Sequence, residues 1–291
     1  MKKTGYCIVC LLIFASFTAF PLHVSADEML ALYGLKGYAY TYSPLPADGF
    51  HIQTGAMYSI FHENNLECRD GYIWVVPLSL TYGDGNFWEI AAGTQWEYWK
   101  NTDFDVDETG IGDIFLGGKV RVLGQEKGMP LDASLMPYIL IPTGDRDKSI
   151  GDLYNYNPTN DDEYSYGINL LLGRRWDRFY FAGNFGINHV DSDHDYIDED
   201  TFFLGLTMEY QISETLTSYV EFINNENKNL YNYPEGHLCY DSNVGEDIRE
   251  IGAGIGWVKD EWGIKVHAGA GMTETSPDLR VMALINRSFS F

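Results

Sequence analysis

The final twelve residues, Arg280–Phe291, alternate between apolar and polar side chains up to the last phenylalanine. One face holds Val281, Ala283, Ile285, Phe289 and Phe291, and the other holds Arg280, Asn286, Ser288 and Ser290. A period of two residues indicates a β-strand with one face against an apolar phase and the other against water. Because a terminal strand with a free edge promotes aggregation and closure removes that edge, the segment predicts a closed β-barrel.

The first 26 residues have the pattern of a secretory signal peptide. A basic start, Met1–Lys3, precedes an apolar run from Cys7 to Phe20, and the small residues of Val24–Ala26 supply a cleavage site before Asp27. The apolar run is too short to cross a bilayer. We therefore assign residues 1–26 to a cleaved signal peptide and expect the rest of the chain to be exported.

The composition excludes some partners but leaves two all-β architectures open. With 42 acidic and 19 basic residues, the chain has a net charge of -23, which argues against nucleic acid as a partner. The 21 tyrosines and 30 glycines suit strands with interfacial aromatic girdles and close backbone packing. An acidic secreted β-sandwich would have a similar composition, so the order of the segments has to decide.

Two cysteines remain after the signal peptide, Cys68 and Cys239. An oxidising compartment permits a disulfide between them, so the pair is a disulfide candidate. Neither belongs to a Cys-x-x-Cys motif or a Cys/His cluster, which disfavours a metal site. We predict no metal and no cofactor.

Strand-like segments occur about twelve times after residue 48. They are residues 49–61, 71–82, 87–98, 111–123, 131–142, 164–172, 179–189, 201–210, 216–223, 249–258, 262–270 and 279–291. The connections after the even-numbered segments are short, whereas those after the odd-numbered ones are mostly longer and more acidic. This parity is typical of outer-membrane barrels, which alternate short periplasmic turns with long extracellular loops. The sequence thus predicts an all-β, transmembrane, antiparallel up-and-down β-barrel over residues 49–291.

Three further segments carry a family resemblance. They are Gly110–Val122, Pro137–Asp145 and Ser276–Val281, with a Gly-x-Gly-Asp…Lys-x-Arg strand followed by a Pro-Thr-Gly-Asp loop. Together they resemble the outer-membrane proteins of the meta-pathway of phenol degradation group, which is related to fatty-acid and aromatic-hydrocarbon channels. The resemblance implies a barrel of about twelve strands with a role in passage, in the outer membrane of a Gram-negative bacterium. It supplies no catalytic residues.

The chain ending also resembles the C-terminal assembly signal of bacterial outer-membrane barrels. The implied partners are the barrel-assembly machinery, outer-membrane lipid and lipopolysaccharide. Arg287 departs from the pattern because it shares a face with Phe289 and Phe291. A charge near the membrane interface costs only about 0–1 kcal/mol, so we expect Arg287 to lie at the periplasmic end of its strand.

Alternation along the strands predicts a lumen of mixed charge. The inward-facing candidates are Glu89, Glu97, Asp113, Lys119, Arg121, Asp132, Glu209, Glu221, Glu250, Lys265 and His267. Facing charges can set the selectivity of a pore. Equally, these residues can pair with one another and fill a narrow barrel, because twelve strands lie between side-chain-filled barrels and wide water channels.

Two regions allow more than one interpretation. Residues 27–48 contain four tyrosines and a Pro-Leu-Pro break, and can form either a plug in the lumen or a periplasmic arm. The acidic cluster in Asp191–Asp200 can bind divalent cations that bridge to lipopolysaccharide phosphates, or can be a solvated, self-repelling loop. The second interpretation of the loop is favoured, since the fixed pattern of a Ca²⁺ loop is absent.

An enzymatic role is disfavoured. A hydrolase site on the outer wall needs a serine and a histidine with a polar orienting group. His189 is the outward-facing histidine in mid-chain, and no serine can be paired with it from the sequence; His51 and His267 are expected to face inward. We predict a channel for small molecules, hydrophobic or aromatic ones among them, whose solute the sequence does not name. The alternative is a closed structural or adhesive barrel that binds an external partner through its acidic loops.

Overall fold

The structure is a computed structural model, and it describes residues 29–64, 69–102, 105–144, 164–191, 198–226, 247–273 and 275–289. The predicted signal peptide, Cys68, Cys239 and residues 192–197, which include Asp193 and Asp195 of the acidic cluster, lie outside these ranges. In the part of the chain that is described, no helix is long and apolar enough to cross a membrane.

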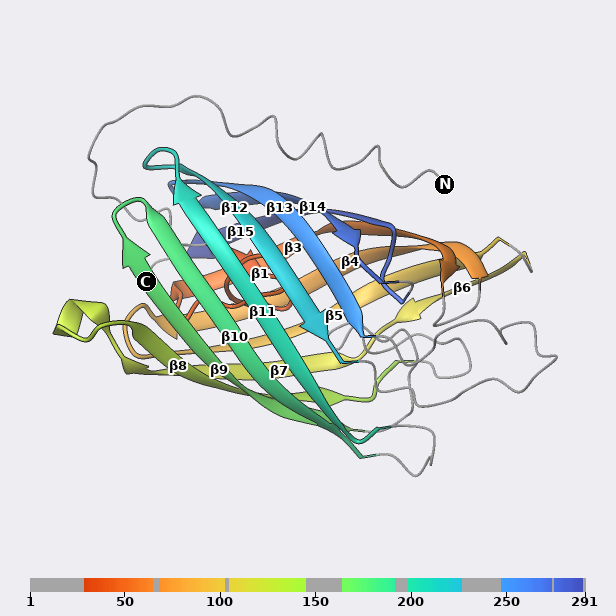
Figure 1. Ribbon diagram of the computed structural model, residues 1–291, viewed down its shortest axis with the longest axis horizontal. Coiled ribbons are helices and arrows are strands. Elements are labelled where there is room, and N and C mark those ends of the chain that lie inside the picture. Colours follow the sequence, from red (N-terminus) through yellow and green to blue (C-terminus); the bar gives the residue numbers. More distant parts are fainter. Residues whose placement is uncertain are drawn as a thin grey trace.

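One antiparallel sheet closes on itself to form a barrel (Figure 1). Its strands are β3 (Asp48–Asn64), β4 (Arg69–Asp84), β5 (Trp88–Asn101), β6 (Val106–Ile111), β7 (Ile114–Leu123), β8 (Asp132–Ile141), β9 (Ser165–Trp176), β10 (Phe179–Val190), β11 (Asp200–Gln211), β12 (Leu216–Asn225), β13 (Ile248–Lys259), β14 (Trp262–Gly271) and β15 (Leu279–Phe289). Strands β6 and β7 follow one another along the same side of β5, so thirteen strands occupy twelve positions. Each strand position pairs with its neighbour in the chain, which confirms the predicted up-and-down barrel.

The C-terminal strand closes the barrel, as predicted from its alternation. Strand β15 pairs with β3 from Leu279↔Ile60 to Phe289↔Phe50. Arg287 lies next to the short β13–β14 turn, where its guanidinium is 2.8 Å from the Glu261 carboxylate and 5.2 Å from the centre of the Trp262 ring. An ion pair and an aromatic face satisfy this charge at the membrane interface.

The two faces of the wall have opposite chemistry. Outward-facing side chains form an apolar band, with Phe202 60% and Val266 55% exposed. The residues between them point inward and are buried, many of them polar. An apolar outer band and a polar interior are the arrangement of a barrel set in lipid. Aromatic clusters mark both ends of the band, Tyr58–Trp74 (ring centroids 4.5 Å apart) and Phe179–Tyr210 (5.0 Å).

The fourth strand position differs from its prediction. Pairing there begins at Val106 rather than at residue 111, and the strand breaks at Gly112 and Asp113. The Gly112 N–H donates to the Gln95 carbonyl (2.8 Å), and the Asp113 carboxylate accepts the N–H groups of Thr143 (3.0 Å) and Gly144 (2.9 Å). These bonds replace rungs of the ladder, so the break fastens the strand to the start of the next loop.

Residues 29–47, here called the lumen segment, lie inside the barrel. They include a small antiparallel sheet of their own, β1 (Leu30–Ala31) and β2 (Gly34–Lys36), which shares no ladder with the described strands of the wall. Figure 1 shows this short hairpin surrounded by barrel strands. All but two of the side chains in the segment are buried, the exceptions being the half-buried Tyr40 and Leu45. The segment therefore occupies space that twelve strands enclose.

Candidate functional site

The eleven inward-facing candidates are all buried in the barrel, none more than 9% exposed. Four of them form two clamps on the lumen segment. Two more, Glu250 and His267, lie near the second of these clamps. The remaining five are distributed along the wall, and the part of any of them in selectivity stays a prediction.

The first clamp consists of Glu89 and Lys119, on β5 and β7. They are direct partners in the ladder and form an ion pair with no exposed surface. The Glu89 carboxylate accepts the N–H groups of Lys36 (3.0 Å) and Ala47 (2.5 Å). The Lys119 ammonium donates to the carbonyls of Lys36 (3.3 Å) and Leu45 (3.1 Å). The pair thus satisfies backbone groups of the segment that would otherwise be buried without partners.

The second clamp consists of Glu221 and Lys265, on β12 and β14. The Glu221 carboxylate accepts the N–H groups of Tyr40 (3.0 Å) and Thr41 (2.6 Å) and the Thr41 hydroxyl (2.6 Å). The Lys265 ammonium donates to the carbonyls of Leu30, Gly37 and Tyr38. Both clamps therefore use one chemistry: an acid accepts from backbone N–H groups, and a lysine donates to backbone carbonyls. Buried charges are tolerated when they are paired and hydrogen-bonded in this way.

Neutral wall side chains add further contacts to the segment. Asn184 accepts the Tyr42 N–H (2.5 Å) and donates to the Tyr42 carbonyl (2.8 Å). Gln53 donates to the Ala31 carbonyl (2.7 Å). Asn184 and Gln53 are not among the predicted site residues, although both alternate with outward-facing residues in the sequence.

The second clamp is surrounded by other polar groups. The His267 ring stacks on Tyr219 (5.8 Å between centroids), and its Nδ1 is 4.0 Å from the Glu221 carboxylate. Arg280 donates to the Tyr40 hydroxyl (2.5 Å) and lies 3.5 Å from the Glu250 carboxylate. The Tyr40 hydroxyl donates to the Met57 sulfur (3.2 Å).

The other candidates stabilise the wall itself or line its interior. Arg121 bonds Asp132 (2.5 Å) and Glu126 at the β7–β8 turn. Glu97 accepts from the Gln95 amide (2.8 Å), and Asp113 fastens the loop after β8. Glu209 lines a small space beside Tyr38 and Lys36 of the lumen segment.

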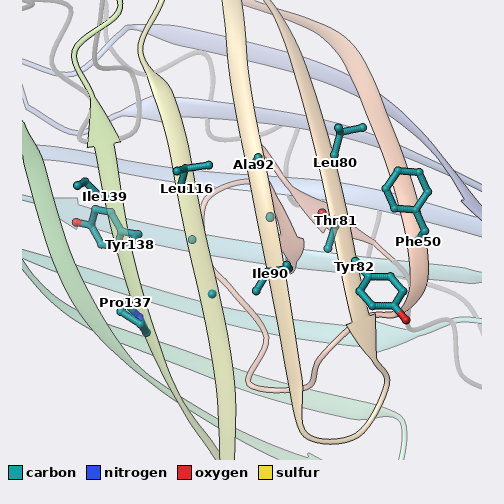
Figure 2. A pocket seen from close by; sticks show the side chains of 13 residues that line it. Phe50, Leu80, Thr81, Tyr82, Ile90, Ala92, Leu116, Pro137, Tyr138 and Ile139 are labelled. Carbon is teal, nitrogen blue, oxygen red and sulfur yellow. The ribbon is translucent and has the colours of Figure 1, made fainter.

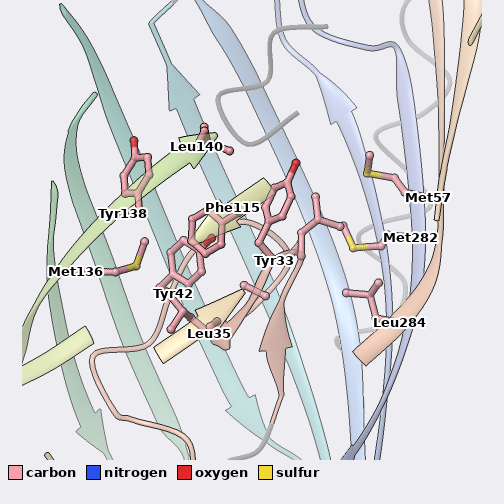
Figure 3. Packing of buried hydrophobic residues seen from close by; sticks show 14 of the residues in the cluster. Tyr33, Leu35, Tyr42, Met57, Phe115, Met136, Tyr138, Leu140, Met282 and Leu284 are labelled. Atoms are coloured by element: carbon pink, nitrogen blue, oxygen red, sulfur yellow. The ribbon is translucent and has the colours of Figure 1, made fainter. Parts of the chain in front are cut away.

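Apolar side chains also line part of the inner wall, and two of them, Met282 and Leu284, are ladder partners of His267 and Lys265. This apolar strip consists of Met57, Val75, Ala91, Phe115, Met136, Tyr138, Leu140, Leu171, Met282 and Leu284. Figure 3 shows Tyr33, Leu35 and Tyr42 of the lumen segment packed against it. The Tyr33 and Phe115 ring centroids are 5.3 Å apart, and Phe115 stacks on Tyr138 at 6.0 Å.

Two wall glycines leave room for the segment. A Cβ on Gly256 would overlap the Met29 sulfur, and a Cβ on Gly205 would overlap Thr41 Cγ2. Neither position has space for a side chain while the segment is in place. The inner wall therefore has recesses that match the lumen segment.

The outer wall has an apolar hollow of about 650 Å³ over β3–β8. Figure 2 shows Leu80, Ile90, Leu116 and Ile139 around it. The β7–β8 ladder is interrupted between Gly117↔Tyr138 and Val120↔Leu135, where Pro137 has no N–H to donate. Besides Pro137, the small residues Ala92, Gly117 and Gly118 line this hollow. Elsewhere on the outer wall, half-buried His189 bonds Asp200 (2.9 Å).

Comparisons with known proteins agree with this architecture. The solved structure of a NanC porin is similar to 83% of this chain and all of that one, with 10% identity and a TM-score of 0.51. A KdgM porin covers 82% of this chain and 99% of its own (9% identity, TM-score 0.47), and the Pseudomonas putida toluene transporter TodX covers 94% and 99% (11% identity, TM-score 0.44). At such identities a likeness concerns the fold. No curated protein sequence matches the chain.

The comparison with protein families is more specific than the likeness of fold. The family described as "Putative MetA-pathway of phenol degradation" matches residues 100–279, which is more than half of the chain. The match includes two of the three segments on which the resemblance was based and most of the third. This match over more than half of the chain shows that the chain belongs to the MetA-pathway of phenol degradation family.

Proposed function

We propose that this protein is an outer-membrane channel for small molecules, exported through a cleaved signal peptide, and that the lumen segment closes it. One observation carries the proposal: a separate segment of the chain, with a small sheet of its own, lies buried in the lumen. Twelve strands enclose more space than small barrels fill with side chains. The recesses at Gly205 and Gly256 widen that space further.

The lumen segment can leave without damage to the barrel. Its two short strands pair with each other and with no described strand of the wall, so its withdrawal breaks no rung of the barrel ladder. It joins the wall covalently through β3, whose first residue is Asp48. A segment attached in this way and held by a set of specific bonds has the properties of a gate.

The proposed solutes are hydrophobic or aromatic small molecules. The family description refers to phenol degradation, and the apolar strip offers such molecules a surface inside the lumen. Polar solutes would meet the clamps instead. This assignment of the solute class rests on the family and on the strip together.

A reversible lock on the lumen segment tests the gate in the full-length chain. The Thr41 and Thr207 hydroxyl oxygens are in contact, so cysteines at these positions are within reach of a disulfide. The lock is T41C/T207C in a C68S/C239S background, and the matched control carries T41C alone. We expect liposomes with the oxidised lock to exclude small aromatic solutes and the reduced lock to admit them. Equal uptake in both states would contradict a gate formed by this segment.

The second candidate is a closed structural or adhesive barrel. The observation that favours it is the clamps themselves, whose buried charged side chains hold the segment with several hydrogen bonds. In that case neither redox state of the lock conducts. Binding of an external partner through the loops would then remain after oxidation, while solute uptake would be absent throughout.

A further inference from the structure

The apolar strip is unusual because it lies on the inner wall of the barrel. The interior of an outer-membrane barrel is ordinarily polar, because water enters it. Here ten apolar or aromatic side chains from β3, β4, β5, β7, β8, β9 and β15 belong, together with Tyr33, Leu35 and Tyr42 of the lumen segment, to one hydrophobic cluster. Without the lumen segment, the strip would be exposed to water at a cost proportional to its area. Exposure of the strip is therefore unfavourable in every state of the protein.

In the closed state, the covering includes a phenol ring. Tyr33 lies against Phe115 with 5.3 Å between ring centroids and 30° between ring planes, and it is 3% exposed. Phe115 in turn stacks on Tyr138, whose hydroxyl donates to Asn188 (3.0 Å). Figure 3 shows Met57 and Met282 on the far side of Tyr33 from Tyr138. Methionine side chains adapt to ligands of different shape and make favourable contacts with rings.

Opening has a direct energetic consequence. When the lumen segment withdraws, Tyr33, Leu35 and Tyr42 uncover the strip. A solute that covers the strip offsets that loss only in the open state, because the segment fills the same space in the closed state. A ligand that binds one of two states better than the other shifts the equilibrium toward that state.

We propose that the apolar strip is the solute-binding site of the lumen, and that Tyr33 occupies it as a competing internal ligand until an uncharged aromatic molecule displaces the segment. The proposal rests on the channel function proposed above. It assigns a solute class, a ring with at most a neutral polar group, because all ten side chains of the strip are apolar or aromatic and an unpaired charge there is costly. It also makes the solute itself the opening signal.

Binding of 2-naphthol to the full-length barrel in detergent, followed by its fluorescence, tests the competition. Removal of the competitor by Y33A should tighten 2-naphthol binding about tenfold, since the apparent Kd is the intrinsic Kd divided by the fraction of competent state. Y33F keeps the ring and should bind as the wild type does. Y33A/F115A should lose the gain, because the stacking partner is gone. Y82A, on the outer wall, is the control for binding outside the lumen.

The T41C/T207C lock supplies the second readout. We expect the oxidised lock to bind no 2-naphthol above the micelle background and the reduced lock to bind it. The charged analogue 2-naphthoate should bind at least tenfold more weakly than 2-naphthol to Y33A. The barrel of every variant is checked by its resistance to SDS at room temperature, which the separate lumen segment should not alter.

Three outcomes would overturn the site: no tighter binding in Y33A, an unchanged gain in Y33A/F115A, or equal binding by the oxidised and reduced locks. Failure of the channel looks different. If the reduced lock binds 2-naphthol and the oxidised lock does not, but no solute crosses liposomes in any variant, the proposed site is supported and the proposed channel is refuted. If uptake follows the lock while Y33A binds as the wild type does, the channel stands and the site fails.

Discussion

The two clamps hold the lumen segment with the same pair of residue types but depend on it to different degrees. Glu89 and Lys119 are ladder partners, so their ion pair persists if the segment leaves. Glu221 and Lys265 lie on strands separated by β13, and every hydrogen bond that Glu221 accepts in the described structure comes from Tyr40 or Thr41. One Glu221 oxygen has no hydrogen-bond partner among the described residues. The first clamp is a stable unit of the wall, whereas the second is complete only in the closed state.

This difference indicates which of the two clamps controls the withdrawal of the lumen segment. A buried charge that loses its partners is strongly destabilising, whereas a charge that keeps its counter-ion is not. Withdrawal of the segment therefore costs more at Glu221 than at Glu89 until water hydrates the lumen. Substitutions at the second clamp should shift the gate more than equivalent substitutions at the first.

The largest effect is expected from Glu221→Leu. The change removes the acceptor for three hydrogen bonds and leaves Lys265 buried beside an apolar side chain in the closed state. Loss of one partner of a buried pair costs about 3 kcal/mol or more, which corresponds to at least a hundredfold rise in the ratio of open to closed barrels. Open probability in planar bilayers measures this ratio. Glu261→Leu, at the exposed turn, is the control, and a closed E221L barrel would refute the importance of the second clamp.

The second prediction concerns Glu89→Gln, which breaks the ion pair but keeps one acceptor oxygen. Lys119 still donates to the Lys36 and Leu45 carbonyls. Because a hydrogen bond to a charged group contributes about 1.5–3 kcal/mol, we expect an increase in open probability of roughly tenfold to a hundredfold. An effect larger than that of E221L would reverse the comparison between the clamps.

Much of the fold could be predicted from local pattern, because a two-residue period and the length of each connection are local properties. The twelve strand positions, the closure of β15 on β3 and the inward direction of all eleven candidates follow from that period. The break at Gly112 could not be predicted in this way. It depends on bonds from Asp113 to Thr143 and Gly144, about thirty residues further along the chain.

The hydrogen bonds of the two clamps could not be predicted from the sequence for a different reason. Their partners are backbone groups of the lumen segment, and backbone N–H and carbonyl groups have no signature in the sequence. The approach of Glu221 and Lys265 to one segment depends on the closure of the barrel, which alternation along single strands does not determine. The inward-facing charged side chains could therefore be predicted from the sequence, but their hydrogen bonds to residues 29–47 could not.

The third test places a larger side chain on the inner wall, in the recess at Gly205. Gly205→Val places side-chain atoms where Thr41 Cγ2 now lies, because even an ideal Cβ at this position overlaps that methyl group. Overpacking costs about 1–3 kcal/mol, so the open probability should rise about tenfold. Gly183→Val is the matched control, because a Cβ there has 3.4 Å to its nearest neighbour. Equal conductance of the two variants would show that the segment does not need the recess at Gly205.

The smallest effect is expected from Thr41→Val, which keeps the shape of the side chain and removes its hydroxyl. The Glu221 carboxylate loses the 2.6 Å hydroxyl bond but keeps the two backbone N–H donors. A single bond of this kind contributes about 0.5–1.5 kcal/mol, so the open probability should rise roughly threefold to tenfold. Combined with E221L, the change should add almost nothing, because the acceptor is already absent. Full additivity of the two substitutions would mean that the Thr41 hydroxyl acts through Thr207 rather than through the second clamp.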